Sequence, residues 1–312
     1  MHERAPTVER PTRVIQLPAG AVEYRLEERG SQVVLMLHGG HVRAALSLGE
    51  EVFAEAGYTI LAPSRPGYGL TPLASGTSPE GFADAVAELC DRLGIDSLAA
   101  VVGQSAGGPT AVTLAARHPD LVKRLILQSA VGLLPWPDRR TRLGAGLVFS
   151  PRNERVTWAL VHTLVRRVPN AGLRLLLRDL TTRPIGDLLA TLSEQHRAML
   201  LELFGQMRSG SGFANDVRTM ATPLSDGPSA VGSGSKTARR LPQVRQPTLV
   251  IASRDDGAVS FDHAQSLVEA IPHARLISSN APSHFIWLGE DYPAIADTIA
   301  NFLHSPQEQV GQ

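Results

Sequence analysis

Short apolar runs rich in Val, Leu and Ile recur along the chain, and they limit its fold more than any other feature. Runs of this kind, without alternating polar residues, are typical of strands buried on both faces of a parallel sheet. Helical patterns lie between them, and alternation of strands and helices favours a sheet covered by helices on both sides. We therefore predict an α/β fold with a doubly wound, mostly parallel sheet whose strands include residues 33–37, 59–62, 98–102, 122–127, 248–252 and 274–278.

Two further patterns complete this sheet domain. Residues 13–30 contain two short alternating segments around Pro18-Ala19-Gly20, which predicts an antiparallel hairpin at one edge of the sheet. Ser78 followed by Pro79 is a favourable helix start, because serine caps a helix and proline fits its first position. We expect helices at 82–94, 110–118, 261–271 and 292–303.

The alternation stops after residue 133, where leucine-rich helical stretches replace strands until about residue 245. We interpret this part as a helical cap inserted into the sheet domain. The Gly/Ser-rich stretches 209–213 and 225–236 predict mobile loops near its end. The predicted organisation is a flexible lead at 1–12, a core at 13–133 and 246–304, a cap at 134–245 and a flexible tail at 305–312.

Composition excludes several classes of partner. The 312 residues carry 30 basic and 30 acidic side chains, so no overall field attracts nucleic acid or an anionic membrane. Cys90 is the single cysteine, which fits a reducing compartment, and the charged N-terminal stretch has no apolar core typical of a signal peptide. No transmembrane run is present in the sequence. We expect a cytoplasmic protein, monomer or homodimer, that acts on a small molecule.

The stretch GQSAGG at 103–108 carries the strongest chemical signal. A Gly-x-Ser-x-Gly pattern between a buried strand and a helix is typical of a nucleophile elbow, with Ser105 at its tip. Glycine is needed at 103 and 107 because a Cβ there would collide with adjacent backbone. The following helix N-terminus makes the Ala106 amide a candidate oxyanion donor. The alternative is an ordinary Gly/Ser turn, as any doubly wound protein can carry.

Other strand ends provide possible partners for this serine. The first buried strand ends in His38-Gly39-Gly40, where Gly40 can offer a second oxyanion amide and His38 is interpreted as structural. A serine nucleophile needs a base and an orienting acid, and later strands end in Asp255-Asp256 and in a loop holding His284. The order Ser105, Asp256, His284 is that of an α/β-hydrolase triad.

The motifs HGG, SRPGYG, GQSAGG, RHPDLVKRLIL, PTLVIASRDD and SHF together resemble the α/β-hydrolase superfamily in its capped subgroup, from about Arg13 to Leu303. The resemblance implies a sheet of about eight strands and favours Asp256 over Asp255 as the acid, by the family pattern G-x-x-D. The chain departs from that pattern at Ser253, Ser260 and Ser64, where relatives usually have glycine, proline and aspartate. None of these departures removes a reacting group.

These features predict a serine hydrolase that cleaves an ester or related acyl bond of a small, apolar substrate. The resemblance also implies alternatives with the same triad: a carbon–carbon bond hydrolase, a lactonase, a proline iminopeptidase or a perhydrolase. Dehalogenase and epoxide-hydrolase chemistry is disfavoured, because those relatives use an aspartate where this chain has Ser105. A hydrolase-like ligand-binding protein with weak turnover is the alternative of a different class.

The remaining candidates are weaker. Residues that could line the substrate pocket are Gly39, His41, Gln104 and Trp136. His162 and His196 lie in leucine-rich helical stretches, where packing or solvent contact is the simpler interpretation, and Cys90 has the position of a buried small residue. No cluster has zinc-ligand spacing, and no phosphate or dinucleotide loop is present, so we expect no metal and no cofactor.

Overall fold

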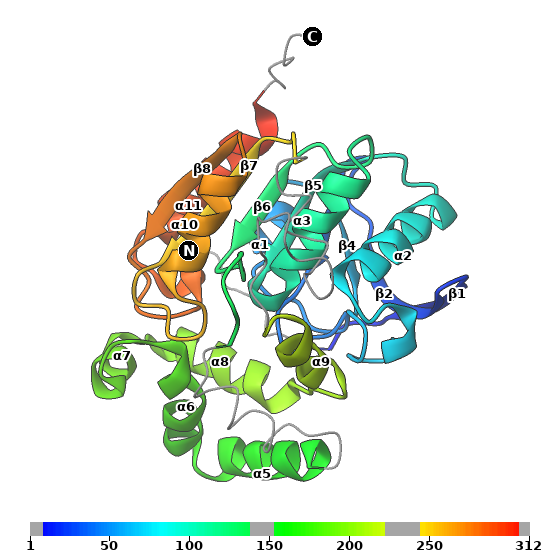
Figure 1. Ribbon diagram of the computed structural model, residues 1–312. Coiled ribbons are helices and arrows are strands. Elements are labelled where there is room, and N and C mark those ends of the chain that lie inside the picture. The colour runs from blue at the N-terminus through cyan, green and yellow to red at the C-terminus, as the bar shows by residue number, and fades with distance from the viewer. Residues whose placement is uncertain (1–8, 138–152, 222–243, 306–312) are drawn as a thin grey trace.

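The computed structural model describes residues 9–137, 153–221 and 244–305, and a single sheet forms its centre (Figure 1). The sheet has eight strands in the order β1-β2-β4-β3-β5-β6-β7-β8. Their bounds are β1 (Arg13–Leu17), β2 (Gly20–Glu27), β3 (Val33–Leu37), β4 (Thr59–Pro63), β5 (Leu98–Gln104), β6 (Leu125–Gln128), β7 (Thr248–Ser253) and β8 (Ala274–Ser279). The mostly parallel, eight-stranded sheet predicted from the sequence is confirmed.

The strand pairing follows the sequence patterns closely. β1 and β2 form the expected antiparallel edge hairpin, β2 is antiparallel to β4, and the other strand pairs are parallel. One predicted strand starts too early: β6 begins at Leu125, and Val122 makes only an isolated bridge to Leu98. Lys123, which lies between Val122 and Leu125, is exposed and is not part of the strand, so the apolar run 122–127 predicted a strand that is too long at its start.

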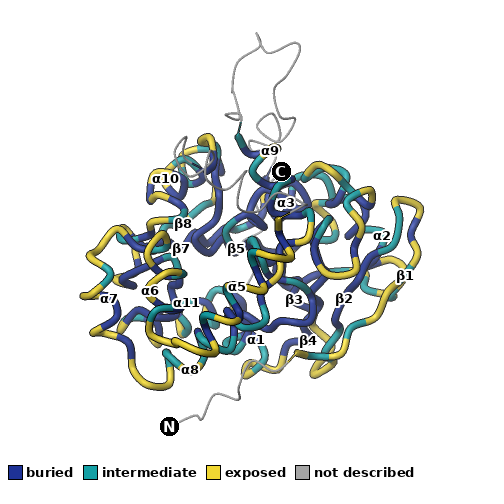
Figure 2. The backbone as a smooth tube through the Cα atoms, turned by 90° about the horizontal axis from the view of Figure 1, so that it is seen from below, coloured by how far each residue is buried: buried dark blue, intermediate teal, exposed yellow. Residues whose placement is uncertain are grey.

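Helices cover both faces of the sheet. One face carries α1 (Glu51–Glu55) and α11 (Tyr292–His304), and the other carries α2 (Pro79–Arg92), α3 (Gly108–Arg117) and α10 (Phe261–Ala270). Ser78 caps α2 as predicted, accepting from the Gly81 amide at 3.3 Å. Figure 2 shows the strands as the buried interior, with exposed residues on outer elements such as β1 and α7.

The inserted helices lie between β6 and β7 in the chain and pack at one end of the sheet domain (Figure 1). They are α5 (Glu154–Arg167), α6 (Pro169–Leu177), α7 (Ile185–Thr191), α8 (Glu194–Gln206) and α9 (Gly212–Thr219), with a short 3₁₀ turn at Arg178–Leu180. Their apolar side chains, including Trp158, Leu177 and Phe204, join one of the two main core clusters. These inserted helices, called the cap below, therefore share a continuous apolar core with the sheet domain.

The first of the two predicted mobile loops is wrong. Residues 209–213 form a turn, exposed at Gly210, and the start of α9: Ser209 is fully buried, and the Ser211 and Gly212 amides donate to the Gly67 carbonyl at 3.1 Å. Small residues are used there for close contact with the Gly67 turn rather than for flexibility. The stretch 225–236 lies outside the described residues. Among the residues described, we find no helix with the length and apolar character needed to cross a membrane.

Candidate active site

Ser105 lies on a strained turn between β5 and α3. Its φ is +48°, a conformation that L-residues seldom adopt and that occurs repeatedly at active sites. A Cβ on Gly103 would lie 2.7 Å from the Ala111 Cβ, and one on Gly107 would lie 2.0 Å from the Leu37 carbonyl oxygen. The structure thus gives the expected physical reason for glycine at both positions, with close backbone contact at Gly107.

The glycine turn after β3 packs directly on this serine. A Cβ on Gly39 would lie 2.8 Å from the Ser105 Cβ and 3.4 Å from its Oγ, so the turn could not approach with a larger residue. The Gly40 amide that follows donates to no carbonyl within the described part of the chain. Ala106, the other predicted oxyanion donor, is fully buried beside Ser105 in a 3₁₀ turn that leads into α3. Both amides therefore belong to segments that meet at the serine.

Asp256 and His284 form a hydrogen-bonded pair. Asp256 Oδ2 lies 2.7 Å from His284 Nδ1, and the Asp256 side chain is fully buried. Its other oxygen, Oδ1, accepts from the Ala258 and Val259 amides at 2.8 and 2.9 Å. Because these two amides fix the carboxylate, Oδ2 is held toward the imidazole. Nδ1 then carries a proton and Nε2 is left as the acceptor.

The backbone of His284 is fixed on both sides. Its amide donates to the Leu180 carbonyl of the cap at 2.8 Å, and its own carbonyl accepts from Ser129 Oγ at 2.9 Å. Among the described residues, no hydrogen bond joins the Ser105 hydroxyl to the His284 ring. Hydrogen bonds between nucleophile and base are often loose without substrate.

The structure also distinguishes the two neighbouring aspartates. Asp255 points to the surface and forms an ion pair with Arg183, at 2.7 Å from Arg183 Nε to Oδ2. Ser253, which stands in place of the family's usual glycine, links the two loops: its hydroxyl donates to the Ala281 carbonyl and accepts from the Asp255 amide at 3.0 Å. This departure therefore stabilises the acid loop against the histidine loop.

A second departure, Ser64, is compensated elsewhere in the fold. Its fully buried hydroxyl donates to Glu23 Oε2 at 2.6 Å and accepts from the Ala44 amide at 2.8 Å. Glu23 lies on β2, so a carboxylate is still present near the end of β4, contributed by the neighbouring strand. The third departure, Ser260, is the N-cap residue of α10, and its side chain makes no capping hydrogen bond.

His38 has the structural role expected for it. Its Nε2 lies 2.9 Å from Glu50 Oε1, and the same oxygen accepts from Arg25 at 2.5 Å; all three side chains are buried. Burial opposes ionisation of Glu50, but its hydrogen bond to His38 and the charge of Arg25 outweigh this and lower the pKa of Glu50 to about 2. The network anchors the segment that follows the glycine turn.

The predicted pocket residues separate into different roles. Trp136 is buried in an apolar cluster with Ala106 and Phe213, beside the serine, whereas Gln104 is buried and donates to the Leu48 carbonyl and to Gln128. His41 packs on Phe213 with ring centres 4.2 Å apart. Burial, and then the charge of Arg65, lowers the pKa of His41 to about 3, so the ring is neutral at physiological pH. Gly39 packs against the Ser105 side chain, as the position of a Cβ built on it shows.

Sequence reasoning missed a buried ion pair beside the site. Arg65, in the turn after β4, makes two hydrogen bonds to Asp216 of α9, at 2.7 and 2.8 Å, and donates to the His38 carbonyl at 2.7 Å. The Tyr68 hydroxyl also donates to Asp216, at 2.6 Å. Arg65 and Tyr68 belong to the SRPGYG motif, which could have signalled them; Asp216 belongs to no motif. Phe213 of the same helix packs against Gly40.

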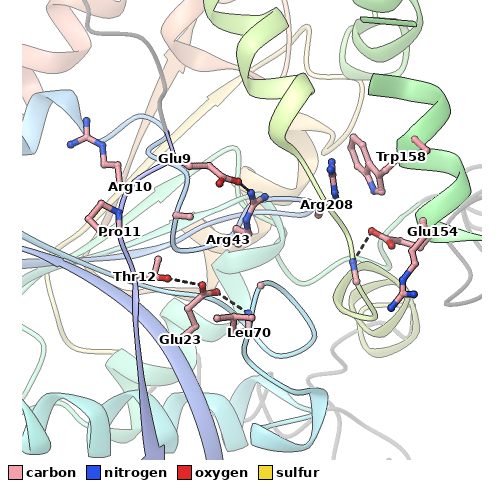
Figure 3. A pocket seen from close by; sticks show the side chains of 15 residues that line it. Glu9, Arg10, Pro11, Thr12, Glu23, Arg43, Leu70, Glu154, Trp158 and Arg208 are labelled. Atoms are coloured by element: carbon pink, nitrogen blue, oxygen red, sulfur yellow. Dashed lines mark hydrogen bonds and ion pairs between the residues drawn. The ribbon is translucent and has the colours of Figure 1, made fainter. Parts of the chain in front are cut away.

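A separate cavity lies between the cap and the N-terminal part of the core. Its volume is about 910 Å³, and its walls include Arg43, Trp158 and Arg208 (Figure 3). None of the predicted triad, oxyanion or pocket residues lines it. Burial and the neighbouring Arg208 lower the pKa of Arg43, whose guanidinium also contacts Glu9. None of the described residues that line this cavity is a serine, a cysteine or a histidine, so the residues around Ser105 are the better candidate for an active site.

Residues 9–137, 153–221 and 244–305 contain no group of three His, Cys, Asp or Glu side chains placed to hold an ion. Cys90 is fully buried, and burial raises the pKa of its thiol to about 12. His162 is also buried, and its Nε2 lies 3.2 Å from the Met207 carbonyl.

Comparison with known proteins agrees with this architecture. An uncharacterised hydrolase of Bacillus subtilis, YcgS, is 31% identical over 301 residues, covering 96% of this chain and all of that protein. A 2-hydroxy-6-oxononadienedioate/2-hydroxy-6-oxononatrienedioate hydrolase from a Pseudomonas species is 26% identical, with 91% and 92% of the two chains covered. An α/β-hydrolase fold protein from Nakamurella multipartita has the same fold, with a TM-score of 0.75 at 22% identity over 94% of this chain and 99% of that one.

The family model described as the alpha/beta hydrolase fold matches residues 32–291, which include the glycine turn, the serine elbow, the cap and the loops of Asp256 and His284. The match therefore spans more than half of the chain, and the protein belongs to the α/β-hydrolase family.

Proposed function

We propose that this protein is a serine hydrolase that cleaves an ester or related acyl bond of a small, apolar substrate. The observation that carries the proposal is the 2.7 Å pair between Asp256 and His284, at the edge of the sheet where Ser105 stands on a left-handed turn. A pure binding protein has no need for a buried acid that orients an imidazole. The hydrolase names of the relatives favour the same class of reaction.

In the proposed reaction, His284 Nε2 takes the proton of the Ser105 hydroxyl as its oxygen attacks the substrate carbonyl. Asp256 keeps the proton of the ring on Nδ1 and stabilises the imidazolium that forms. The Gly40 and Ala106 amides would then hold the negative oxygen of the tetrahedral intermediate. His284 returns its proton to the leaving group, which departs and leaves an acyl group on Ser105.

Water completes the cycle. His284 removes a proton from a water molecule, the hydroxide attacks the acyl carbon, and Ser105 recovers its proton as the acid product leaves. The apolar cluster beside Ala106, formed in part by Trp136, Phe213 and Val131, favours an apolar acyl or alcohol group at this point. The balanced formal charge of the chain favours no strongly charged macromolecular partner, and we propose a small-molecule substrate.

Hydrolysis of a carbon–carbon bond is a second candidate, favoured by the relative from Pseudomonas, whose name gives an oxo-dienedioate as its substrate. The same serine, base and oxyanion amides can serve an attack on a ketone carbonyl. The two candidates differ in the leaving group, which is an alkoxide from an ester and a carbanion from a ketone.

A labelling and activity experiment tests the proposal. A fluorophosphonate should label the purified protein at Ser105, and a panel of p-nitrophenyl esters, lactones, proline amides and dienone acids should identify the bond cleaved. Ser105→Ala should abolish labelling and covalent turnover. Removal of such a nucleophile lowers kcat by a factor on the order of 10⁶. Unchanged activity of Ser105→Ala on every accepted substrate would end the proposal, and stable ligand binding without labelling would favour a binding protein.

A further inference from the structure

We propose that cap residues 180–182 position the acid and the base of the site, so that the cap takes part in catalysis beyond any role in substrate selection. The inference rests on the proposed triad of Ser105, His284 and Asp256. The first of these three cap residues ends the 3₁₀ turn Arg178–Leu180, and the three lie between the loop after β7 and the loop after β8. No side chain of theirs reacts, and their effect passes through His284 and Asp256.

The contact to the base is made by the backbone. The His284 amide donates to the Leu180 carbonyl at 2.8 Å, so the histidine's own peptide group is held by the cap. The Thr181 hydroxyl donates to the Pro282 carbonyl at 2.7 Å, two residues before the histidine. Two hydrogen bonds therefore fix the loop that directs the imidazole toward Asp256.

The contact to the acid is made on the opposite edge of the same cap residues. Thr181 and Asp256 form an isolated antiparallel bridge, and the Thr182 amide donates to the Asp255 carbonyl at 2.9 Å. Arg183 continues the attachment through its ion pair with Asp255. One short piece of cap is thus bonded at once to the loop of the acid and to the loop of the base.

Gly257 shows how closely this piece approaches the acid loop. A Cβ on Gly257 would lie 2.7 Å from the backbone nitrogen and oxygen of Thr181. The φ of Gly257 lies outside the left-handed range, so glycine is required there by the neighbouring cap backbone rather than by its own conformation. Thr181 is itself buried, with 7% of its surface exposed, and its hydroxyl also accepts from the Arg183 amide at 3.0 Å.

The experiment compares Thr181→Val with Thr182→Val in the full-length protein. Valine keeps the shape of threonine and removes the hydroxyl; at 181 this leaves the Pro282 carbonyl without its donor, while the exposed Thr182 side chain makes no such bond. Misplacement of catalytic groups by about 1 Å can cost on the order of 100-fold in rate. We expect Thr181→Val to lower kcat and the rate of fluorophosphonate labelling by about 10- to 100-fold with KM unchanged.

Two further readouts separate positioning from general stability. Thr181→Ser keeps the hydroxyl and should have the kcat of the wild type. The pH–rate profile of Thr181→Val should shift, because the environment of His284 changes. Thr182→Val should match the wild type in kcat and in pH–rate profile. If Thr181→Val does not fold, Gly257→Ala gives the same test, because its Cβ displaces Thr181 from the acid loop. Normal kcat in the folded variant overturns the inference while leaving the triad intact. Full activity of Ser105→Ala would instead overturn the proposed function.

Discussion

Replacement of Asp256 by asparagine gives a sharp test of the acid assignment. In the structure, Oδ1 accepts two backbone amides and Oδ2 faces His284 Nδ1, all within 2.9 Å. An asparagine in this environment keeps its carbonyl oxygen toward the two amides and turns its NH₂ group toward the imidazole. Nδ1 must then accept a hydrogen bond, which moves the ring proton to Nε2. The base can no longer receive the serine proton.

The expected loss follows from this change of tautomer. A serine enzyme with its acid amidated in the same way loses about 10⁴-fold in kcat, equivalent to about 5.5 kcal/mol of transition-state stabilisation. We expect a loss of that order for Asp256→Asn, measured as kcat on the best ester of the substrate panel. The folded structure should be unchanged, because the amide keeps the two backbone hydrogen bonds, and a matching thermal midpoint would verify this.

Asp255→Asn is the matched control. It weakens only a half-exposed ion pair with Arg183, whose contribution to stability is at most about 1 kcal/mol. We expect its kcat to stay within about twofold of wild type. Wild-type turnover of Asp256→Asn combined with an inactive Asp255→Asn would refute the reasoning, since it would exchange the roles of the two carboxylates.

Two further predictions concern the fold that supports the site. Gly107→Ala places a Cβ 2.0 Å from the Leu37 carbonyl oxygen, and we expect a loss of several kcal/mol or no soluble protein, measured by urea unfolding against the surface change Gly186→Ala, whose Cβ meets no atom within 4 Å; wild-type stability would contradict the backbone contact. Stability should also fall in acid. Burial lowers the pKa of His263 to about 4 and that of His41 to about 3, so the unfolded chain binds protons below about pH 6.5 that the folded chain does not. The stability contributed by each neutral ring is present above that pH and is reduced by about 2 kcal/mol at about pH 5. The free energy of unfolding in urea, measured above pH 6.5 and at about pH 5, tests this. His263→Gln retains an acceptor for the Gly132 amide and should remove the part of the pH dependence that His263 contributes. If the stability of His263→Gln falls with pH as that of the wild type does, the assignment to His263 is wrong.

Local sequence patterns predicted the sheet because its strands are buried on both faces. Apolar runs such as 98–102 have no solvent-facing alternation, and they match the observed strands within a few residues. The elbow was predictable for a different reason: its Gly-x-Ser-x-Gly pattern occupies five consecutive residues between a buried strand and a helix. The contact that requires Gly107 is distant in sequence, at the Leu37 carbonyl, but the pattern is recognisable without it.

The turn at 209–213 shows where the same reasoning fails. Glycine and serine there were interpreted as a flexible loop, yet Ser209 is fully buried and Gly212 lies where the Tyr68 ring leaves no room for a Cβ. Glycine permits either freedom or close approach, and the choice depends on what packs against it. That neighbour is distant in sequence, so the pattern alone could not decide.

The cap contacts were unpredictable for a further physical reason. The Arg65 pair with Asp216 joins residues 151 positions apart, and a single carboxylate among 30 acidic residues carries no motif. The contact of Leu180 with His284 is made by a backbone carbonyl, which every residue possesses, so the residue type at position 180 does not predict it. The attachment through Arg65 and Asp216 reaches the turn that holds Gly40, by the hydrogen bond of Arg65 to the His38 carbonyl. The attachment through cap residues 180–182 reaches the loops of the base and the acid. A displacement of the cap would therefore disturb the proposed oxyanion donor Gly40 through α9 and the imidazole through residues 180–182, and mutations at the two attachments should impair different steps of the proposed reaction.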